Sequence, residues 1–150
     1  MKESIAALFV MAALLGASLA SGQNRKPATP SPNADALLYA ELAQAPEKAR
    51  AKRNPMENDP VAFAAGQNLF ERHCSECHGP AGYGTEKAPS LRAEEVQSAT
   101  PGAIFWILTN GVVRRGMPVW SKLPEPQRWQ LVSFIKGLGT APKSPDKKPD

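Results

Sequence analysis

The chain has 150 residues, of which 42% are hydrophobic and 21% are charged; this composition is typical of a folded domain and excludes a collagen-like or wholly disordered protein. The formal net charge of +4 is small and forms no basic stripe, which argues against nucleic-acid binding. Two cysteines allow at most one disulfide and so exclude a disulfide-dense scaffold.

The N-terminus has the pattern of a secretory signal peptide. Lys2 precedes an apolar run that ends at Leu15, and small residues at Ser18 and Ala20 fit a cleavage site. An uncleaved membrane anchor is the alternative, but this stretch is shorter than the ~20 residues that a spanning helix needs. We therefore predict a signal peptide over 1–20, a mature chain without a transmembrane segment, and a periplasmic location.

Residues 21–59 are rich in proline and charge and are predicted to be a linker. Within this linker, Asn33 can cap a short helix over 34–44 that has a weak apolar stripe. The charged part, 46–59, is predicted to be a solvated connector, with partner docking as the alternative. At the other end of the chain, the proline- and lysine-rich residues 141–150 are predicted to be a disordered tail.

The compact region is predicted to span residues 60–140. Asp59–Pro60 is an N-cap followed by a proline in the first turn, and it begins a helix that extends to about His73. A region of this length is small for a self-sufficient apolar core, so we expect a metal, a covalent cross-link or a cofactor to contribute to its stability.

Two further helices are predicted in this region. Thr100–Pro101 repeats the capping pattern and begins a helix that ends near Asn110, before Gly111. The last helix, over about 124–138, has no Ser or Thr cap, but its apolar residues recur at helical spacing. No stretch shows sustained strand alternation, and the predicted fold class is therefore all-α.

The segment Cys74-Ser75-Glu76-Cys77-His78 has the C-x-x-C-H spacing of covalent haem attachment. Two thiols three positions apart lie on one side of a helical turn, where they can bond to the two vinyl groups of one haem. The histidine that follows Cys77 is then carried beneath the ring, where its imidazole can ligate the iron. We predict one haem c per chain, attached through Cys74 and Cys77 and ligated by His78.

Three other interpretations of this segment are weaker. A thioredoxin-like redox pair requires a preceding strand in a βαβ context, which the sequence does not show. A zinc site would need His73, Cys74, Cys77 and His78, and ligands from one short run cannot easily surround a metal tetrahedrally. A simple disulfide would leave the small core without other support.

With these motifs the compact region resembles the class I cytochromes c, the small mono-haem electron carriers. Apart from C-x-x-C-H, three features over about 60–139 carry the resemblance. They are Gly116-Met117-Pro118, the pairs Gly66 with Phe70 and Leu131 with Phe134, and Ala88-Pro89-Ser90-Leu91.

The resemblance implies a role for each of these features. The first and last helices are expected to cross where Gly66 lets the backbones approach and the aromatic rings interlock. The Pro89 carbonyl is expected to accept the second N–H of His78, which would orient that ring. Met117 is expected to be the distal ligand.

Two methionines of the mature chain are candidates for the sixth iron ligand. Met56 lies in a proline-flanked linker, whereas Met117 lies in a Gly-Met-Pro turn that can hold a thioether against a flat ring. Met117 is therefore the predicted ligand, with a gap-filling core methionine as the alternative. His73 adjoins Cys74, so we expect it to point away from the iron as a surface histidine.

Other residues are predicted to complete the haem pocket. Trp106 and Trp120 could pack near the ring, although ordinary core packing would look the same. Arg114 could hold a haem propionate, face an acidic partner or simply be solvated.

We predict an exported one-electron carrier with His and Met axial ligands, a redox protein as donor and another as acceptor, and no enzymatic activity. The protein is expected to be a monomer or a weakly bound subunit. The first alternative is a cytochrome c subunit of a larger dehydrogenase or oxidase complex. A haem peroxidase or ligand sensor is the second, although a di-haem peroxidase would need a second C-x-x-C-H segment.

Overall fold

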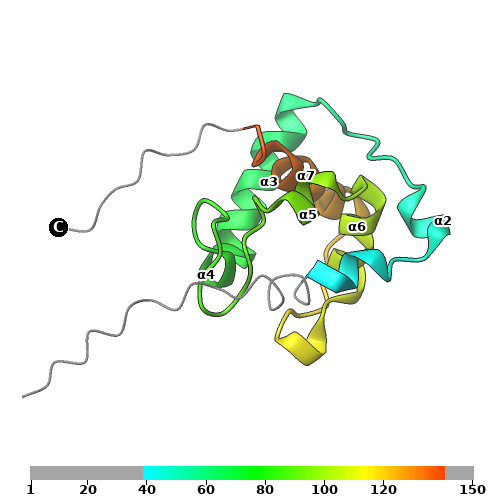
Figure 1. Cartoon of the computed structure of the whole chain (residues 1–150). Helices are drawn as coiled ribbons and strands as arrows, with labels where there is room; N and C mark the ends of the chain where they lie inside the picture. Colours follow the sequence, from blue (N-terminus) through cyan, green and yellow to red (C-terminus); the bar gives the residue numbers. More distant parts are fainter. Residues whose placement is uncertain (1–38, 141–150) are drawn as a thin grey trace, which may run out of the picture.

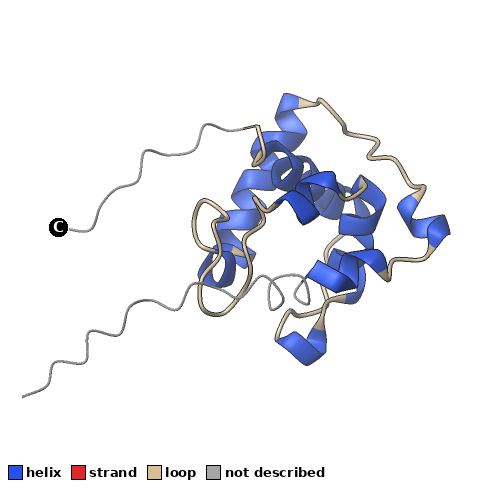
Figure 2. Cartoon of the chain, viewed as in Figure 1, coloured by secondary structure: helices blue, strands red, loops and turns tan. Residues whose placement is uncertain are grey.

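The computed structural model describes residues 39–140, which form a group of helices joined by loops (Figures 1 and 2). No strand occurs among them, and their one β-type pairing is an isolated bridge between Val112 and Met117. The fold is therefore all-α, as predicted. The helices are α2 (Glu47–Arg50), α3 (Pro60–His73), α4 (Ser75–His78), α5 (Glu94–Ser98), α6 (Pro101–Asn110), the 3₁₀ turn η1 (Val113–Arg115) and α7 (Glu125–Gly137).

The predicted signal peptide and C-terminal tail lie outside the described residues. Of the short helix predicted over 34–44, residues 39–43 are helical, and residues 34–38 lie outside the described part of the chain. Between residues 39 and 140, no helix has the length and apolar character needed to cross a membrane.

The capping signals place the helix starts where they were predicted. The Asp59 carboxylate accepts hydrogen bonds from the N–H groups of Val61 and Ala62 at 2.8 and 3.3 Å, at the start of α3. The Thr100 hydroxyl accepts one from the N–H of Ala103 at 3.2 Å, at the start of α6. These bonds satisfy N–H groups that have no partner within the helix, which explains the agreement.

The centre of the fold is the crossing of α3 and α7, which overlap beside their labels in Figure 1. A Cβ atom on Gly66 would lie only 2.0 Å from the Gln130 carbonyl oxygen, so the two backbones can approach this closely only at a glycine. One turn further along α3, the rings of Phe70 and Phe134 are 5.0 Å apart. The crossing expected from the resemblance is confirmed.

We expect Gly66→Ala to destabilise the folded, haem-loaded protein by roughly 1–3 kcal/mol, because the added methyl group has no space. In an open helical position the same change stabilises by about 1 kcal/mol, so the sign of the effect is diagnostic. Urea denaturation of the variant measures it, with Asn68→Ala, an exposed change in the same helix, as the control. A more stable Gly66→Ala protein would contradict the close approach.

Residues 46–59, predicted to be a solvated connector, are mostly exposed but are attached to the helices at two points. At the first point, a Cβ atom on Gly102 of α6 would lie 2.0 Å from the Ala49 carbonyl oxygen. At the second, the buried Asn54 side chain donates to the Trp129 carbonyl oxygen at 3.2 Å and to the Ser133 hydroxyl at 2.8 Å. This part of the chain therefore packs as part of the domain.

Candidate functional site

A cavity of about 1280 Å³ lies among α4, α6 and the loops that follow each of them. Its volume exceeds the ~300–1,000 Å³ typical of small-molecule sites, so it suits a large group. Apolar side chains of α6 and α7 form part of its wall, namely Ile104, Ile107, Leu108 and Ile135. A wall of this kind favours a flat, largely apolar ligand.

Both cysteines line this cavity from one helical turn. Cys74 connects α3 to α4 and is buried, Cys77 lies within α4 and is exposed, and both thiols are free. Burial, with a smaller contribution from Cys77, raises the pKa of the Cys74 thiol to about 11, so this thiol is protonated at neutral pH. Two free thiols at this spacing can attach one flat group at two points.

His78, the last residue of α4, also lines the cavity. Its Nδ1 lies 2.9 Å from the Pro89 carbonyl oxygen. Because a carbonyl only accepts, Nδ1 carries the proton and Nε2 keeps the lone pair that a metal needs. Burial lowers the pKa of His78, while the Pro89 hydrogen bond opposes this shift, and the net effect favours the neutral, ligating form.

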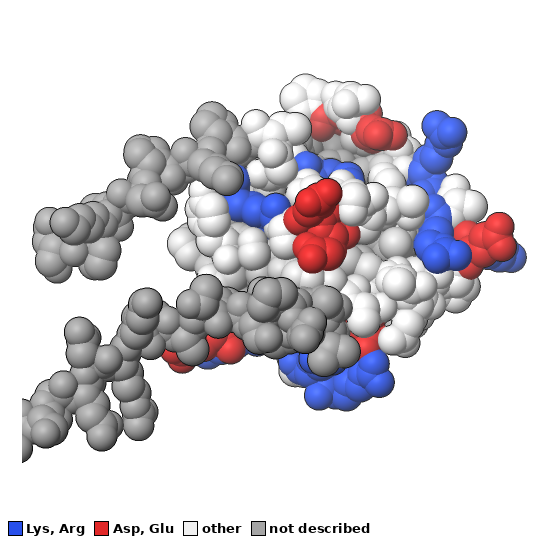
Figure 3. Space-filling model, viewed as in Figure 1, with Lys and Arg blue, Asp and Glu red and all other residues white. Residues whose placement is uncertain are grey.

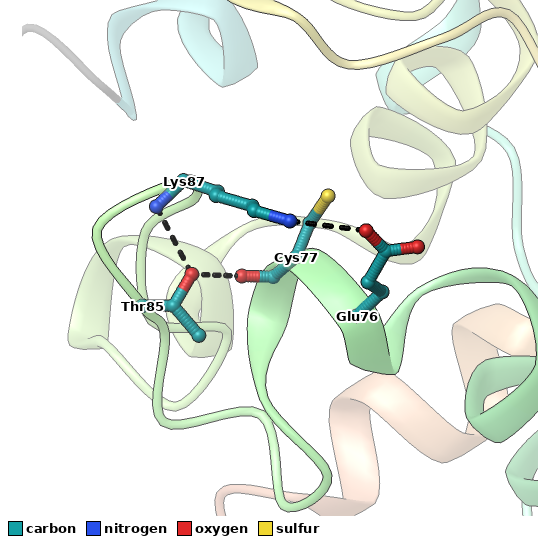
Figure 4. A network of polar contacts seen from close by, with 4 residues as sticks. All are labelled: Glu76, Cys77, Thr85 and Lys87. Carbon is teal, nitrogen blue, oxygen red and sulfur yellow. Dashed lines mark hydrogen bonds and ion pairs between the residues drawn. The ribbon is translucent and has the colours of Figure 1, made fainter.

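The loop that carries Pro89 is held against α4 by a small polar network (Figure 4). The Thr85 hydroxyl donates to the Cys77 carbonyl oxygen at 2.5 Å and accepts from the Lys87 N–H at 3.0 Å. The Lys87 ammonium pairs with the Glu76 carboxylate at 3.0 Å, and this interaction raises the pKa of Lys87. Both of these charged side chains are largely exposed, so the pair contributes little stability and the Thr85 bonds do more to fix the loop.

Met117 lines the cavity from the loop after α6. Its backbone N–H and carbonyl pair with those of Val112 at 3.2 and 3.0 Å, and η1 closes this short hairpin. Met56 does not line the cavity and packs against the hydrophobic core instead. Between the two candidate methionines, the structure therefore brings only Met117 to the residues of the C-x-x-C-H turn.

Only one of the two tryptophans predicted for the haem pocket lines the cavity. Trp120 lines the cavity and its backbone N–H donates to the Leu108 carbonyl oxygen at 3.0 Å, whereas Trp106 is absent from the lining. The reason is helical periodicity, because α6 presents Ile104, Ile107 and Leu108 to the cavity and Trp106 belongs to another face. His73 is exposed, as predicted, but it lines the cavity instead of pointing away from it, and its ring centre lies 5.3 Å from that of Trp120.

The arginine predicted to contact the haem does not lie at the cavity. Arg114 is absent from the cavity lining and forms an ion pair with Glu41, whereas its neighbour Arg115 lines the cavity. Arg92 lines it as well and is anchored by hydrogen bonds to the carbonyl oxygens of Ala81 at 2.8 Å and Leu138 at 2.9 Å.

Sequence reasoning missed the N-terminal contribution to the site. Tyr39, Glu41 and Leu42 all line the cavity, although they precede the region expected to bind the cofactor. No local pattern indicates this, because the contacts join residues far apart in sequence. Arg92 was detectable in principle, since it directly follows the Ala88-Pro89-Ser90-Leu91 motif.

The residues at the cavity fit a covalently bound haem c. They provide two free thiols, an imidazole whose tautomer is set by Pro89, and a thioether from a separate loop. Over residues 39–140, no three His, Cys, Asp or Glu side chains gather in a way that could hold a metal ion by themselves.

Comparison with known proteins gives two matches. Residues 61–135 match the family described as cytochrome C oxidase, cbb3-type, subunit III. A relative described as "Cbb3-type cytochrome c oxidase subunit CcoP", from Rubrivivax gelatinosus, is 30% identical over 109 residues, which is 71% of this chain. The aligned part is 34% of that relative, so the chain spans about a third of its length.

Proposed function

Because this chain belongs to the c-type cytochromes of the family described as cytochrome c oxidase, cbb3-type, subunit III, we propose that it transfers single electrons as a cytochrome subunit of an oxidase complex. The observation that carries the proposal is the convergence of Cys74, Cys77, His78 and Met117 on one cavity. These residues come from two parts of the chain that only the fold brings together.

The side chains have separate tasks in this proposal. Cys74 and Cys77 hold one haem c, in agreement with the single C-x-x-C-H segment in the sequence. His78 ligates through Nε2 while the Pro89 carbonyl orients its ring. Met117 would hold the iron through its thioether sulfur, a ligand that raises the reduction potential of a haem. When bound, haem c supplies an iron that gains or loses one electron.

One consideration favours a subunit over a free carrier, which was the first prediction. The matched family and the relative from Rubrivivax gelatinosus are both described as oxidase subunits. The donor and acceptor would then be neighbouring redox groups of one assembly.

We also propose that the chain is not itself an enzyme and that it works on the periplasmic side. If both His78 and Met117 hold the haem iron, they would leave it no free position at which oxygen or peroxide could bind. The periplasmic location rests on the signal peptide predicted over 1–20, which lies outside the described residues.

If the haem is attached covalently, removal of either cysteine should weaken its retention by the chain. Cys74→Ala and Cys77→Ala should each lower the amount of haem that remains on the chain after acid–acetone extraction, because each removes one thioether. The wild-type protein should retain its colour under the same treatment. Extraction of intact haem from the wild type would disprove attachment.

Purification from native membranes separates a subunit from a free carrier. We expect the tagged full-length chain to elute in a large complex together with oxygen-consuming activity, at constant stoichiometry across the peak. Elution of all the haem-loaded chain as a soluble monomer, separate from that activity, would restore the free-carrier interpretation.

A further inference from the structure

The first described residues, 39–45, lie against the cavity, and we call them the N-terminal strap. Residues 39–43 are helical, and three strap side chains, Tyr39, Glu41 and Leu42, line the cavity. In Figure 1 the strap is the cyan segment that begins beside the yellow loop containing η1. The strap therefore contacts the site where the ligands of the proposed cofactor converge.

One end of the strap is bonded to the loop on the histidine side of the cavity. The Tyr39 hydroxyl donates to the Ser90 carbonyl oxygen at 2.9 Å. Ser90 directly follows Pro89, whose carbonyl oxygen lies 2.9 Å from His78 Nδ1. This hydrogen bond connects the strap to the segment that orients His78.

The middle of the strap is bonded to the loop on the methionine side. The Glu41 carboxylate forms an ion pair and hydrogen bond with the Arg114 guanidinium of η1. The Glu41 side chain is only 12% exposed, whereas that of Arg114 is 67% exposed. Figure 3 shows basic atoms at the lower edge of the molecule, where Figure 1 places η1. A buried carboxylate without this partner would be costly.

The other end of the strap is fixed by packing. Ala45 is buried, and α2 follows immediately. The α2 backbone lies so close to α6 that only a glycine, Gly102, fits at the contact. The strap is thus held at three points. One is on the loop that carries Pro89, the hydrogen-bond partner of His78, one is on the loop that carries Met117, and the third is the packing at Ala45.

We propose that Glu41 is a positioning residue for the sixth ligand: through Arg114 it holds the Val112–Met117 hairpin closed, so that the Met117 thioether stays at the cavity. This inference rests on the proposed function, because it assumes that Met117 ligates a haem iron. Arg114 lies two residues after Val112 and three before Met117, inside the hairpin that the ion pair restrains.

The test uses the haem-loaded, full-length protein and cyanide, which binds ferric iron only when the methionine has moved away. We expect Glu41→Gln to raise the rate of cyanide binding roughly tenfold, because an uncharged amide pairs poorly with Arg114 and opening of the hairpin becomes easier. Backbone hydrogen exchange at Val112 and Met117, whose N–H groups bond within the hairpin, should speed up in parallel.

Three further variants make the test specific. Arg114→Gln should raise the cyanide rate to a similar extent, and the double variant should do no more than either single change, because both remove the same interaction. Glu71→Gln removes a negative charge from the exposed surface of α3 and should leave the rate unchanged. If Glu41→Gln fails to fold, Arg114→Gln alone decides, since its side chain is mostly exposed.

The outcomes separate this inference from the proposed function. Wild-type cyanide rates in Glu41→Gln and Arg114→Gln, with methionine ligation intact in the wild type, would overturn the role of Glu41 and leave the proposed function standing. Absence of methionine ligation in the wild type itself would overturn both.

Discussion

Met117→Ala is expected to abolish the weak far-red absorption band of methionine-ligated ferric haem and to open the iron to carbon monoxide and cyanide. The reduction potential should fall by on the order of 0.1–0.3 V, part of the ~0.8 V range over which axial ligands set haem potentials. The bonds between Val112 and residue 117 join backbone atoms, so the substitution removes the sulfur while the hairpin stays intact. Absorption spectroscopy, ligand titration and potentiometry measure these effects.

Met56→Ala is the matched control. This methionine packs against the hydrophobic core and is absent from the cavity lining, so its removal should lower stability but leave the far-red band and the potential unchanged. Absence of the band from the wild type, with spectrum and potential unchanged in Met117→Ala but both altered in a His73 variant, would show that the iron has two histidine ligands. Rapid carbon monoxide binding by the wild type would favour a ligand sensor over an electron carrier.

Phe70→Ala is expected to reduce the free energy of unfolding of the haem-loaded protein by roughly 3–5 kcal/mol. Phe70 is 0% exposed, and its ring centre lies 5.0 Å from that of Phe134 across the contact between α3 and α7. The backbones are fixed there by the close approach at Gly66, so the helices cannot move together to fill the space. The cavity left behind adds to the lost burial of the ring.

Phe63→Ala provides a control on the same helix against the same partner ring. Phe63 is 37% exposed, and its ring centre lies 5.4 Å from that of Phe134. Because part of this ring already contacts water, its removal should cost clearly less than that of Phe70. Denaturant titrations of both variants measure the difference. Equal losses would contradict the assignment of Phe70 to the centre of the packing between these helices.

Together these variants separate two tasks of the same small fold. Met117 acts on the iron through its side chain, whereas Phe70 acts on the frame that holds α3, and with it the C-x-x-C-H turn, in place. We therefore expect Phe70→Ala to unfold at lower denaturant concentration while its folded form keeps the far-red band.

The predictions that succeeded from the sequence depend on local chemistry. Asp59–Pro60 and Thr100–Pro101 define the starts of α3 and α6 because a cap acts within one helical turn. The C-x-x-C-H segment places its thiols by the geometry of the single turn that contains them. Met117 was preferred over Met56 because it lies between Gly116 and Pro118, and of the two only Met117 lines the cavity. Its ligation of the iron stays a prediction.

The contacts that tertiary structure decided are long-range. The side of α6 that faces the cavity does not carry Trp106, whereas the loop that follows η1 places Trp120 in the lining, and both depend on how α6 and this loop pack. In the same way Arg114 pairs with Glu41, 73 residues earlier in the chain, while Arg115 lines the cavity. From the sequence alone, two adjacent arginines are equivalent. What distinguishes them is the buried carboxylate of the N-terminal strap, which lies next to only one of them. An ion pair depends on distance in space and not on separation along the chain.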